Sequence, residues 1–202
     1  MIGESFINFF SKLPGVGLRS SKRIFFSLVQ NHLKIEKMIS VLNEIKENIF
    51  ICKLCNNIGS QDICEICKSD KRDKSKLCIV LNIPDLYVIE ESEIYDGCYL
   101  VLQNNESVKN SITEFIRSIN LDKLRNIIFT NQPKEIIVAN NLTNIGSAQS
   151  VYIAEIVREI VDLNNIECEI TSLASGMPVG SEIEYLDTAT IIASMSNRKK
   201  IS

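Results

Sequence analysis

Four of the seven cysteines in this 202-residue chain lie within sixteen residues of one another. They are Cys52, Cys55, Cys64 and Cys67, and they form the pattern C-x2-C-x8-C-x2-C. Two C-x2-C pairs this close together supply four thiolates, which is a ligand set that Zn²⁺ takes in structural sites. Four protein ligands leave no position for the water that a catalytic zinc needs. The pattern therefore predicts one structural Zn²⁺ per chain.

Disulfide bonds or a redox motif are the alternative interpretations of these cysteines. The chain begins MIGESFINFF, which has no basic segment ahead of an apolar one, so we expect no signal peptide and a cytoplasmic protein. Disulfides are rare in the cytosol, and a thioredoxin-like motif would not come doubled. The other cysteines, Cys78, Cys98 and Cys168, have apolar neighbours and are predicted to be buried, unreactive strand residues.

The charge of the chain is unevenly distributed. Residues 1–76 carry 13 basic and 8 acidic side chains, whereas residues 77–202 carry 9 and 17, and the whole chain has a net charge of −3. The basic amino-terminal part hints at a polyanionic partner, although such an asymmetry also arises by chance. The single histidine, His32, lies in a helical stretch and is expected to be a surface position. The sequence contains no run of eighteen apolar residues, so we expect no membrane span.

Hydrophobic periodicity predicts an α/β protein with a helical amino-terminal part. Helices are predicted over 3–12, 18–34 and 35–50, and a charged linker over 68–76. Strands and helices then alternate, with strands over 77–82, 98–103, 135–140 and 167–173 and helices over 84–92, 107–129, 147–163 and 187–197. This order implies a mostly parallel sheet with helices on both faces, and the apolar third strand should lie in its centre.

The segment LPGVG, residues 13–17, separates the first two predicted helices. Gly15 and Gly17 would permit the positive φ and close approach of a tight turn. Their amides, together with the start of the second helix, would form a donor surface suited to phosphate, and Arg19, Lys22 and Arg23 follow within about two turns. We therefore predict a DNA-backbone site without base specificity. A plain loop before an exposed basic helix is the alternative.

The segment LPGVGLRSSKR resembles the helix-hairpin-helix of the RecR family of bacterial recombination mediators. The resemblance continues through the cysteine module, the α/β part and the stretch SLASGMPVGSEIEYLDTATIIASMSNRKKI, and so covers nearly the whole chain. It implies a helix-hairpin-helix domain at 1–51, a zinc module and linker at 52–76, a Toprim-like domain at 77–172, and a carboxyl-terminal segment at 173–202 that takes part in oligomer contacts.

The resemblance also implies a function. The chain would be a non-enzymatic DNA-binding clamp in recombinational repair, assembled as a ring-like homo-oligomer such as a tetramer. It would act with RecO-like and RecF-like partners to load recombinase on single-stranded DNA. Arg19 and Arg23 would contact phosphates, on single- or double-stranded DNA of any sequence.

The sequence departs from the Toprim pattern at its acidic positions. Toprim enzymes hold Mg²⁺ with a glutamate at the end of the first strand, where this chain has Leu81 and Asn82, and with acidic residues after the third strand. Residues 140–150 contain no carboxylate, and Ile145 and Ser147 stand where RecR chains keep acids that also contact RecO. A Toprim-type nuclease or primase-like enzyme would therefore lack its ligands. A zinc-stabilised protein-interaction module remains the third alternative.

Overall fold

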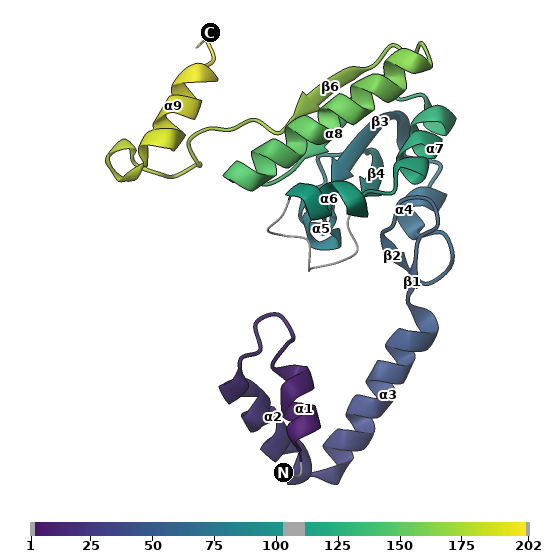
Figure 1. Cartoon of the computed structure of the whole chain (residues 1–202), viewed down its shortest axis with the longest axis vertical. Helices are drawn as coiled ribbons and strands as arrows, with labels where there is room; N and C mark the ends of the chain where they lie inside the picture. The colour runs from purple at the N-terminus through teal and green to yellow at the C-terminus, as the bar shows by residue number, and fades with distance from the viewer. Residues whose placement is uncertain (1–2, 103–111, 201–202) are drawn as a thin grey trace. The chain divides into compact units, whose positions relative to one another are not determined.

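The computed structural model describes residues 3–102 and 112–200, which form two compact units (Figure 1). The first unit spans Met1–Ile49 and the second Phe50–Ser202. The cysteine module belongs to the second unit and packs with the α/β part. The division of the second unit into residues 52–76, 77–172 and 173–202 stays a prediction.

The first unit consists of three helices, which are α1 (Glu4–Phe10), α2 (Leu18–Val29) and α3 (His32–Asn48). The boundary between the second and third helices lies earlier than predicted, at Asn31. The Asn31 side chain accepts a hydrogen bond from the Leu33 amide at 3.1 Å, so it caps the start of α3. Asparagine prefers this position because its side chain satisfies an amide that the helix leaves unpaired. His32 is exposed at the start of α3, as the sequence indicated.

An aromatic cluster holds α1 against α2. The rings of Phe6 and Phe10 stack with their centroids 4.1 Å apart, and Phe25 of α2 lies 5.7 Å from Phe6. Gly3 has φ of 93°, and a Cβ there would lie 2.4 Å from the Phe25 ring. The glycine is required both by its backbone conformation and by this close approach.

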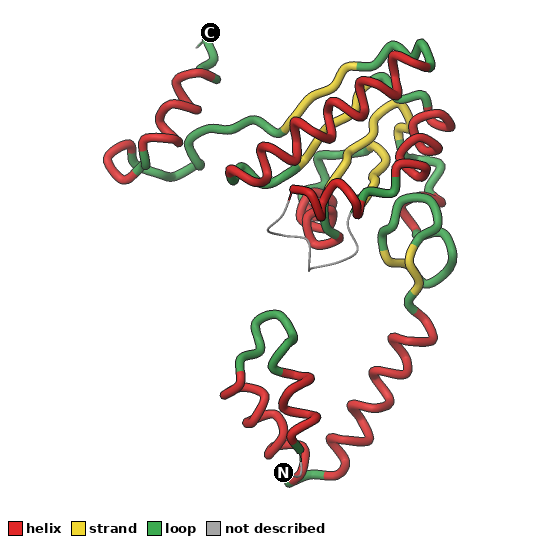
Figure 2. Tube along the Cα trace, viewed as in Figure 1, coloured by secondary structure: helices red, strands yellow, loops and turns green. Residues whose placement is uncertain are grey.

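The second unit is built on a four-stranded parallel sheet in the order β4-β3-β5-β6 (Figure 2). Its strands are β3 (Asp73–Val80), β4 (Gly97–Val101), β5 (Glu135–Ala139) and β6 (Glu169–Ser172). The sequence prediction of a parallel sheet with β5 in its interior is confirmed. The first strand starts four residues earlier than predicted, because Asp73 already pairs with Gly97 of β4. Part of the predicted charged linker is therefore strand.

Helices cover both faces of this sheet, as predicted. On one face, α5 (Ile83–Glu91) packs against Cys78, Val80, Tyr99 and Val101. On the other face lie α6 (Ile112–Ser118), α7 (Leu121–Asn131) and α8 (Asn144–Leu163). Successive strand residues point to opposite faces. Leu77 and Ile79 therefore belong to the larger core with these three helices, whose buried members include Phe115, Leu124, Ile128, Ile153 and Val157.

The prediction of one continuous helix over 107–129 is wrong. Its first residues, 107–111, lie outside the described residues, and the rest forms two helices that separate at Asn120. The Asn120 side chain accepts a hydrogen bond from the Lys123 amide at 2.9 Å and so starts a new helix. Residues beyond β6 form a short 3-10 turn, Ile183–Tyr185, and α9 (Thr188–Ser196), which Asp187 caps. Within 3–102 and 112–200, no helix is both long and apolar enough to cross a bilayer.

The three cysteines outside the cluster differ in burial. Cys78 is buried in β3, and desolvation raises the pKa of its thiol to about 12. Cys98 in β4 and Cys168 just before β6 are only half-buried, so the prediction of full burial is wrong for them. Cys168 was also predicted to be a strand residue, but β6 begins one residue later, at Glu169. Desolvation nevertheless raises the pKa of both thiols, which disfavours their thiolates.

Candidate metal centre and nucleic-acid interface

The structure brings Cys52, Cys55, Cys64 and Cys67 together. Their four sulfur atoms all lie within 4.8 Å of one another, and the Sγ atoms of Cys55 and Cys64 are 3.6 Å apart. A tetrahedral site with Zn–S bonds of about 2.3 Å separates its sulfurs by about 3.8 Å. The first three cysteines are buried and Cys67 is half-buried. The cluster could therefore hold one metal ion, and its donor set fits Zn²⁺.

Short backbone elements position these sulfurs. The hairpin strands β1 (Phe50–Ile51) and β2 (Ile58–Gly59) pair antiparallel, and α4 (Glu65–Lys68) carries the last cysteine. The Asn57 amide donates to the Cys55 sulfur at 3.5 Å, and the Cys64 amide donates to the Cys52 sulfur at 3.4 Å. Amide donors of this kind stabilise thiolates, which are the form that binds metal.

Gly59 allows the two cysteine pairs to approach each other. A Cβ at this position would lie 2.9 Å from the Cα of Cys64 and 3.1 Å from its Cβ. Asn56 completes the first turn in the left-handed region with φ of 63°, which asparagine tolerates better than most residues. The fold of this module therefore depends on residues between the cysteines as well as on the cysteines.

The four sulfurs lie close enough to shift one another's pKa. Hydrogen bonds from Cys55 and Cys67 lower the pKa of Cys64, because they stabilise its thiolate. Hydrogen bonds to the Cys55 and Cys64 sulfurs, together with burial, raise the pKa of Cys67, because its protonated thiol is the donor in those bonds. Four adjacent thiolates repel one another in a buried site, so only a cation allows all four to lose their protons together.

The cysteine module is attached to the edge of the sheet. The Val101 amide of β4 donates to the Cys55 carbonyl at 2.8 Å, and the Asn56 side-chain amide donates to the Val101 carbonyl at 2.7 Å. Lys123 of α7 donates to the Asn56 side-chain oxygen at 2.5 Å. Folding of the module is thereby coupled to the position of β4 and α7. Nothing in the sequence near Asn56 indicates partners 45 and 67 residues away.

The α1–α2 turn has one left-handed glycine rather than the two predicted. Gly15 has φ of 73°, whereas Gly17 has φ of −79° and ψ of 172°. The prediction of positive φ at Gly17 is wrong because Gly17 serves as the extended N-cap residue of α2. Ser21 is buried behind it and donates to the Gly17 carbonyl at 3.0 Å. Within 4 Å of the place where a Cβ would stand on Gly15 or Gly17, there is no described atom.

The basic side chains that follow this turn are all exposed. Arg19, Lys22 and Arg23 lie in the first turn and a half of α2, and Arg19 and Arg23 share a face at i, i+4. Among the described residues, none of the three makes an ion pair. The N-cap residue of α2 is Gly17, which has no side chain to accept a hydrogen bond from the first amides of the helix. The first amides of the helix therefore point to solvent next to uncompensated positive charge.

Comparison with known proteins gives strong similarity along the chain. The chain is 36% identical over 197 residues to the Recombination protein RecR of Rickettsia massiliae, which covers 97% of this chain and 94% of the relative. The corresponding protein of Rickettsia prowazekii is also 36% identical over 97% of this chain. Residues 176–199 match the family model described as RecR, C-terminal. The chain belongs to the RecR family.

Membership of the RecR family supports a role in DNA recombination and repair. It agrees with the resemblance identified from the sequence and with the order of a helical amino-terminal part, a four-cysteine module and an α/β part. Each of these has its expected place in the structure.

In this RecR family member, amide side chains follow the ends of β3 and β5, where the sequence resemblance led us to look for acidic residues. Leu81 is buried after β3, and the Asn82 side chain donates to Asp85 at 3.1 Å. After β5, the Asn140 side chain donates to the Gly146 carbonyl at 2.8 Å, and Thr143 caps α8. In the described part of the chain, the four cysteines are the one group of three or more potential metal-ligating side chains. The carboxyl ends of β3 and β5 thus present hydrogen-bonded amides in place of a carboxylate cluster.

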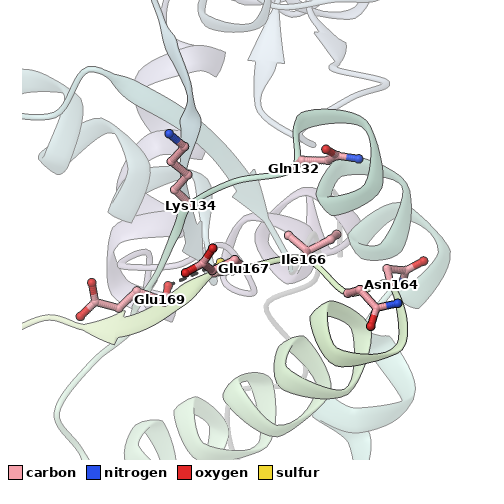
Figure 3. Close-up of a pocket in the computed structure, with 8 residues that line it drawn as sticks. Gln132, Lys134, Asn164, Ile166, Glu167 and Glu169 are labelled. Atoms are coloured by element: carbon pink, nitrogen blue, oxygen red, sulfur yellow. Dashed lines mark hydrogen bonds between the residues drawn. The ribbon is translucent and has the colours of Figure 1, made fainter.

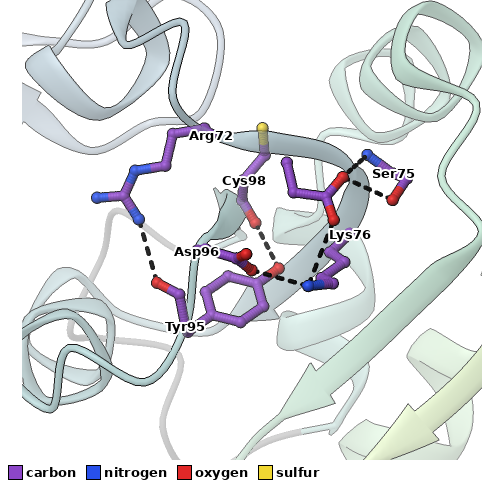
Figure 4. A network of polar contacts seen from close by, with 7 residues as sticks. Arg72, Ser75, Lys76, Tyr95, Asp96 and Cys98 are labelled. Atoms are coloured by element: carbon purple, nitrogen blue, oxygen red, sulfur yellow. Dashed lines mark hydrogen bonds and ion pairs between the residues drawn. The ribbon is translucent and has the colours of Figure 1, made fainter.

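The basic segment at residues 71–76 is less available than its sequence suggests (Figure 4). Arg72 pairs with Glu90 of α5 and donates to the Tyr95 carbonyl at 3.3 Å. Lys76 lies 2.9 Å from a carboxylate oxygen of Asp96. These pairs attach the start of β3 to its neighbours in the RecR fold. Lys74 remains exposed, without an ion pair among the described residues.

A cavity of about 560 Å³ lies near the ends of α7 and α8 (Figure 3). Gln132, with φ of 43°, and Asn165, with φ of 51°, form its walls. Lys134 lines it together with Glu167 and Glu169. None of the predicted site residues lies here. Because the lining contains one lysine and two glutamates, it has no uniform positive charge that would select an anion.

Proposed function

We propose that this chain is a non-enzymatic DNA-binding clamp that mediates recombinational repair. It acts with RecO-like and RecF-like partners to load recombinase on single-stranded DNA. The observation that carries this proposal is the group of exposed cations, Arg19, Lys22 and Arg23, beside the uncapped start of α2. The family of the chain supports the recombination role, and this group supports the mode of contact with DNA.

Phosphate is the part of DNA that this surface fits. The first amides of α2 lack intrahelical acceptors, and the helix dipole adds positive potential at the same end. A phosphate can approach the backbone at Gly15 and Gly17 closely, since no Cβ covers it. The flexible cationic side chains reach backbone oxygens but offer no fixed pattern to base edges, so binding is independent of sequence.

The cysteine cluster binds one Zn²⁺ per chain, and its role is structural. All four metal positions are taken by Cys52, Cys55, Cys64 and Cys67, so the ion has no open position for a substrate. The Zn²⁺ charge stabilises the four thiolates and keeps the module folded against β4. The cluster therefore supports the architecture of the clamp and not a chemical step.

Absence of catalysis is part of the proposal. Phosphoryl transfer by a Toprim site depends on carboxylates that hold Mg²⁺, and Leu81, Asn82 and Asn140 replace them near the strand ends. Purified protein should neither nick nor relax DNA in the presence of Mg²⁺. Cleavage that disappears after substitution within residues 140–150 would contradict this part.

Self-association into a ring or clamp is supported by exposed apolar side chains in both units. On α3, Val41, Leu42 and Ile45 are each 45–53% exposed, although the helix carries them on its apolar stripe. In the carboxyl-terminal segment, Ile192 and Met195 are exposed as well. Apolar surface of this extent is typical of interaction sites. A closed assembly would also place several hairpins on one DNA molecule and multiply their weak contacts.

The direct test is the double substitution Arg19→Ala with Arg23→Ala. We expect loss of measurable DNA binding at moderate salt, with equal loss on different DNA sequences. A matched control is Lys37→Ala with Lys46→Ala, which removes two exposed cations from α3 in the same unit. Zinc content and oligomer mass should stay at the parent values in both variants. If the arginine variant binds DNA like the parent, the DNA surface lies elsewhere.

A further inference from the structure

The strand β6 forms an outer edge of the sheet, next to β5. The Glu169 amide donates to the Lys134 carbonyl at 2.8 Å, so the backbone of Glu169 points towards β5. Backbone groups alternate between the two sides of a strand, and those of Ile170 and Ser172 therefore point away from the sheet. Among the described residues, none donates to or accepts from these outward groups. β6 thus presents an unpaired edge.

This edge is accessible from outside the fold. Ser172 and Leu173 are exposed. Ile170 is half-buried, because its side chain packs against the core that α8 also covers. An accessible row of unpaired amides and carbonyls is a template for pairing with another chain.

The cavity of about 560 Å³ lies at the start of this edge, and Glu167 and Glu169 line it (Figure 3). Lys134 makes no ion pair within the described part of the chain, and its ammonium points away from the two glutamates in Figure 3. Asn164 also lines the cavity and donates its side-chain amide to the Ile160 carbonyl at 2.7 Å, which leaves its oxygen as an acceptor. The cavity therefore combines two uncompensated carboxylates with a neutral acceptor.

A third carboxylate stands directly across the sheet from Glu169. Glu135 of β5 is its register partner, so the two side chains lie on the same face of the sheet. The Thr171 hydroxyl donates to Glu135 at 3.1 Å, but no described cation pairs with either glutamate. Like charges directly opposite each other on neighbouring strands destabilise a sheet. A cation bound at this edge would relieve the repulsion.

These charges decide between the possible occupants of the edge. A second copy that paired its own β6 here would bring glutamates against glutamates, which opposes self-pairing. Nucleic acid is disfavoured for the same reason, because its phosphates would face carboxylates. An extended segment with basic side chains suits both the unpaired backbone and the carboxylates.

We propose that the β6 edge binds an extended basic segment of a partner protein. The segment adds to the sheet as a further strand and pairs its backbone with Ile170 and Ser172. It places an arginine or lysine side chain in the cavity, beside Glu167 and Glu169. Strand addition of this kind takes its affinity from backbone hydrogen bonds and its specificity from neighbouring side chains.

The first test uses full-length, zinc-loaded protein and a fluorescein-labelled nine-residue peptide of alternating arginine and valine. Anisotropy titrations compare the parent with Glu169→Lys and with Glu91→Lys, which changes an exposed glutamate of α5 outside the cavity. We expect Glu169→Lys to weaken binding about three- to tenfold and Glu91→Lys less than twofold. Zinc content and the urea unfolding midpoint check that each variant is folded.

Ser172→Pro tests the backbone pairing, with Ser172→Ala as its matched control. Proline is tolerated on an edge strand where the N–H faces solvent, so the fold should survive while an outward donor is lost. We expect the proline variant to bind the peptide about three- to tenfold more weakly, and the alanine variant less than twofold. DNA affinity should stay at the parent value in both variants, so this result is separate from the test of the DNA site.

Several results would overturn the proposal. No saturable binding by the parent would mean that the glutamates only protect the edge from aggregation. Equal effects of Glu169→Lys and Glu91→Lys would mean nonspecific attraction. Equal effects of the two Ser172 variants would mean that no strand is added. Binding that appears only after deletion of residues 187–202 would mean that the basic carboxyl end of another copy occupies the edge.

Discussion

Substitution of Gly59 by alanine tests whether the backbone between the cysteines controls metal binding. The new Cβ would lie 2.9 Å from the Cα of Cys64, whereas ordinary carbon–carbon contacts begin at about 3.5 Å. The two segments must therefore separate by roughly 0.6 Å. Metal–ligand distances vary by only about 0.2 Å, so a shift of this size strains the tetrahedral arrangement.

The magnitude of the effect follows from overpacking. Forcing an extra methyl group into a tight contact costs about 1–3 kcal/mol. Because each 1.4 kcal/mol is a factor of ten, Zn²⁺ affinity should fall about five- to 150-fold. The fall is expected although all four cysteines are retained.

Competition with a chromogenic chelator measures this affinity, with Ser60→Ala as the control at the neighbouring exposed position. The control should bind Zn²⁺ like the parent. An unchanged affinity in Gly59→Ala would refute the reasoning, since it would mean that the module relaxes without cost. A fully unfolded variant would be recognised by loss of the hydrogen bond from the Val101 amide to the Cys55 carbonyl, seen as rapid exchange of that amide.

Three further results are expected. Glu90→Gln removes the partner of the half-buried Arg72 and should lower the free energy of unfolding in urea by about 1–2 kcal/mol, whereas the exposed neighbour Glu91→Gln should change it little. Chelation of the metal should accelerate amide exchange across residues 50–68 and at Val101, and added Zn²⁺ should restore protection; acidification should release the metal too, because protons compete for the thiolates. Deletion of residues 187–202 should reduce the native mass, whereas an unchanged mass would mean that α9 folds back on its own chain.

The sequence predicted the elements that rest on strong local patterns. Spacing alone identified the cysteine cluster, because a four-thiolate site needs only two C-x2-C pairs that can meet. Alternating strand and helix segments identified the parallel sheet, and the apolar run at residues 136–139 placed β5 in its interior. These features depend on residues close together in the sequence.

Features set by long-range contacts were not predictable in this way. The apolar periodicity of residues 112–129 continues through Asn120, so it could not reveal that this side chain caps a new helix. The charge of residues 71–76 indicated a free basic linker, but Arg72 and Lys76 find carboxylates in Glu90 and Asp96, 18 and 20 residues away. The contact between Asn56 and Val101 likewise depends on where the cysteine module meets β4.

The salt dependence of DNA affinity tests the central claim, that the α2 hairpin holds the phosphate backbone. Each phosphate contact contributes about 0.7 to 0.9 to the slope of log K against log salt concentration. The slope is measured for Arg19→Ala and for Arg23→Ala separately, over a series of low salt concentrations. The account predicts that each substitution reduces the slope by about this amount per chain that contacts DNA. Lys37→Ala on α3 should keep the parent slope. Parent-like slopes in both arginine variants would contradict the account.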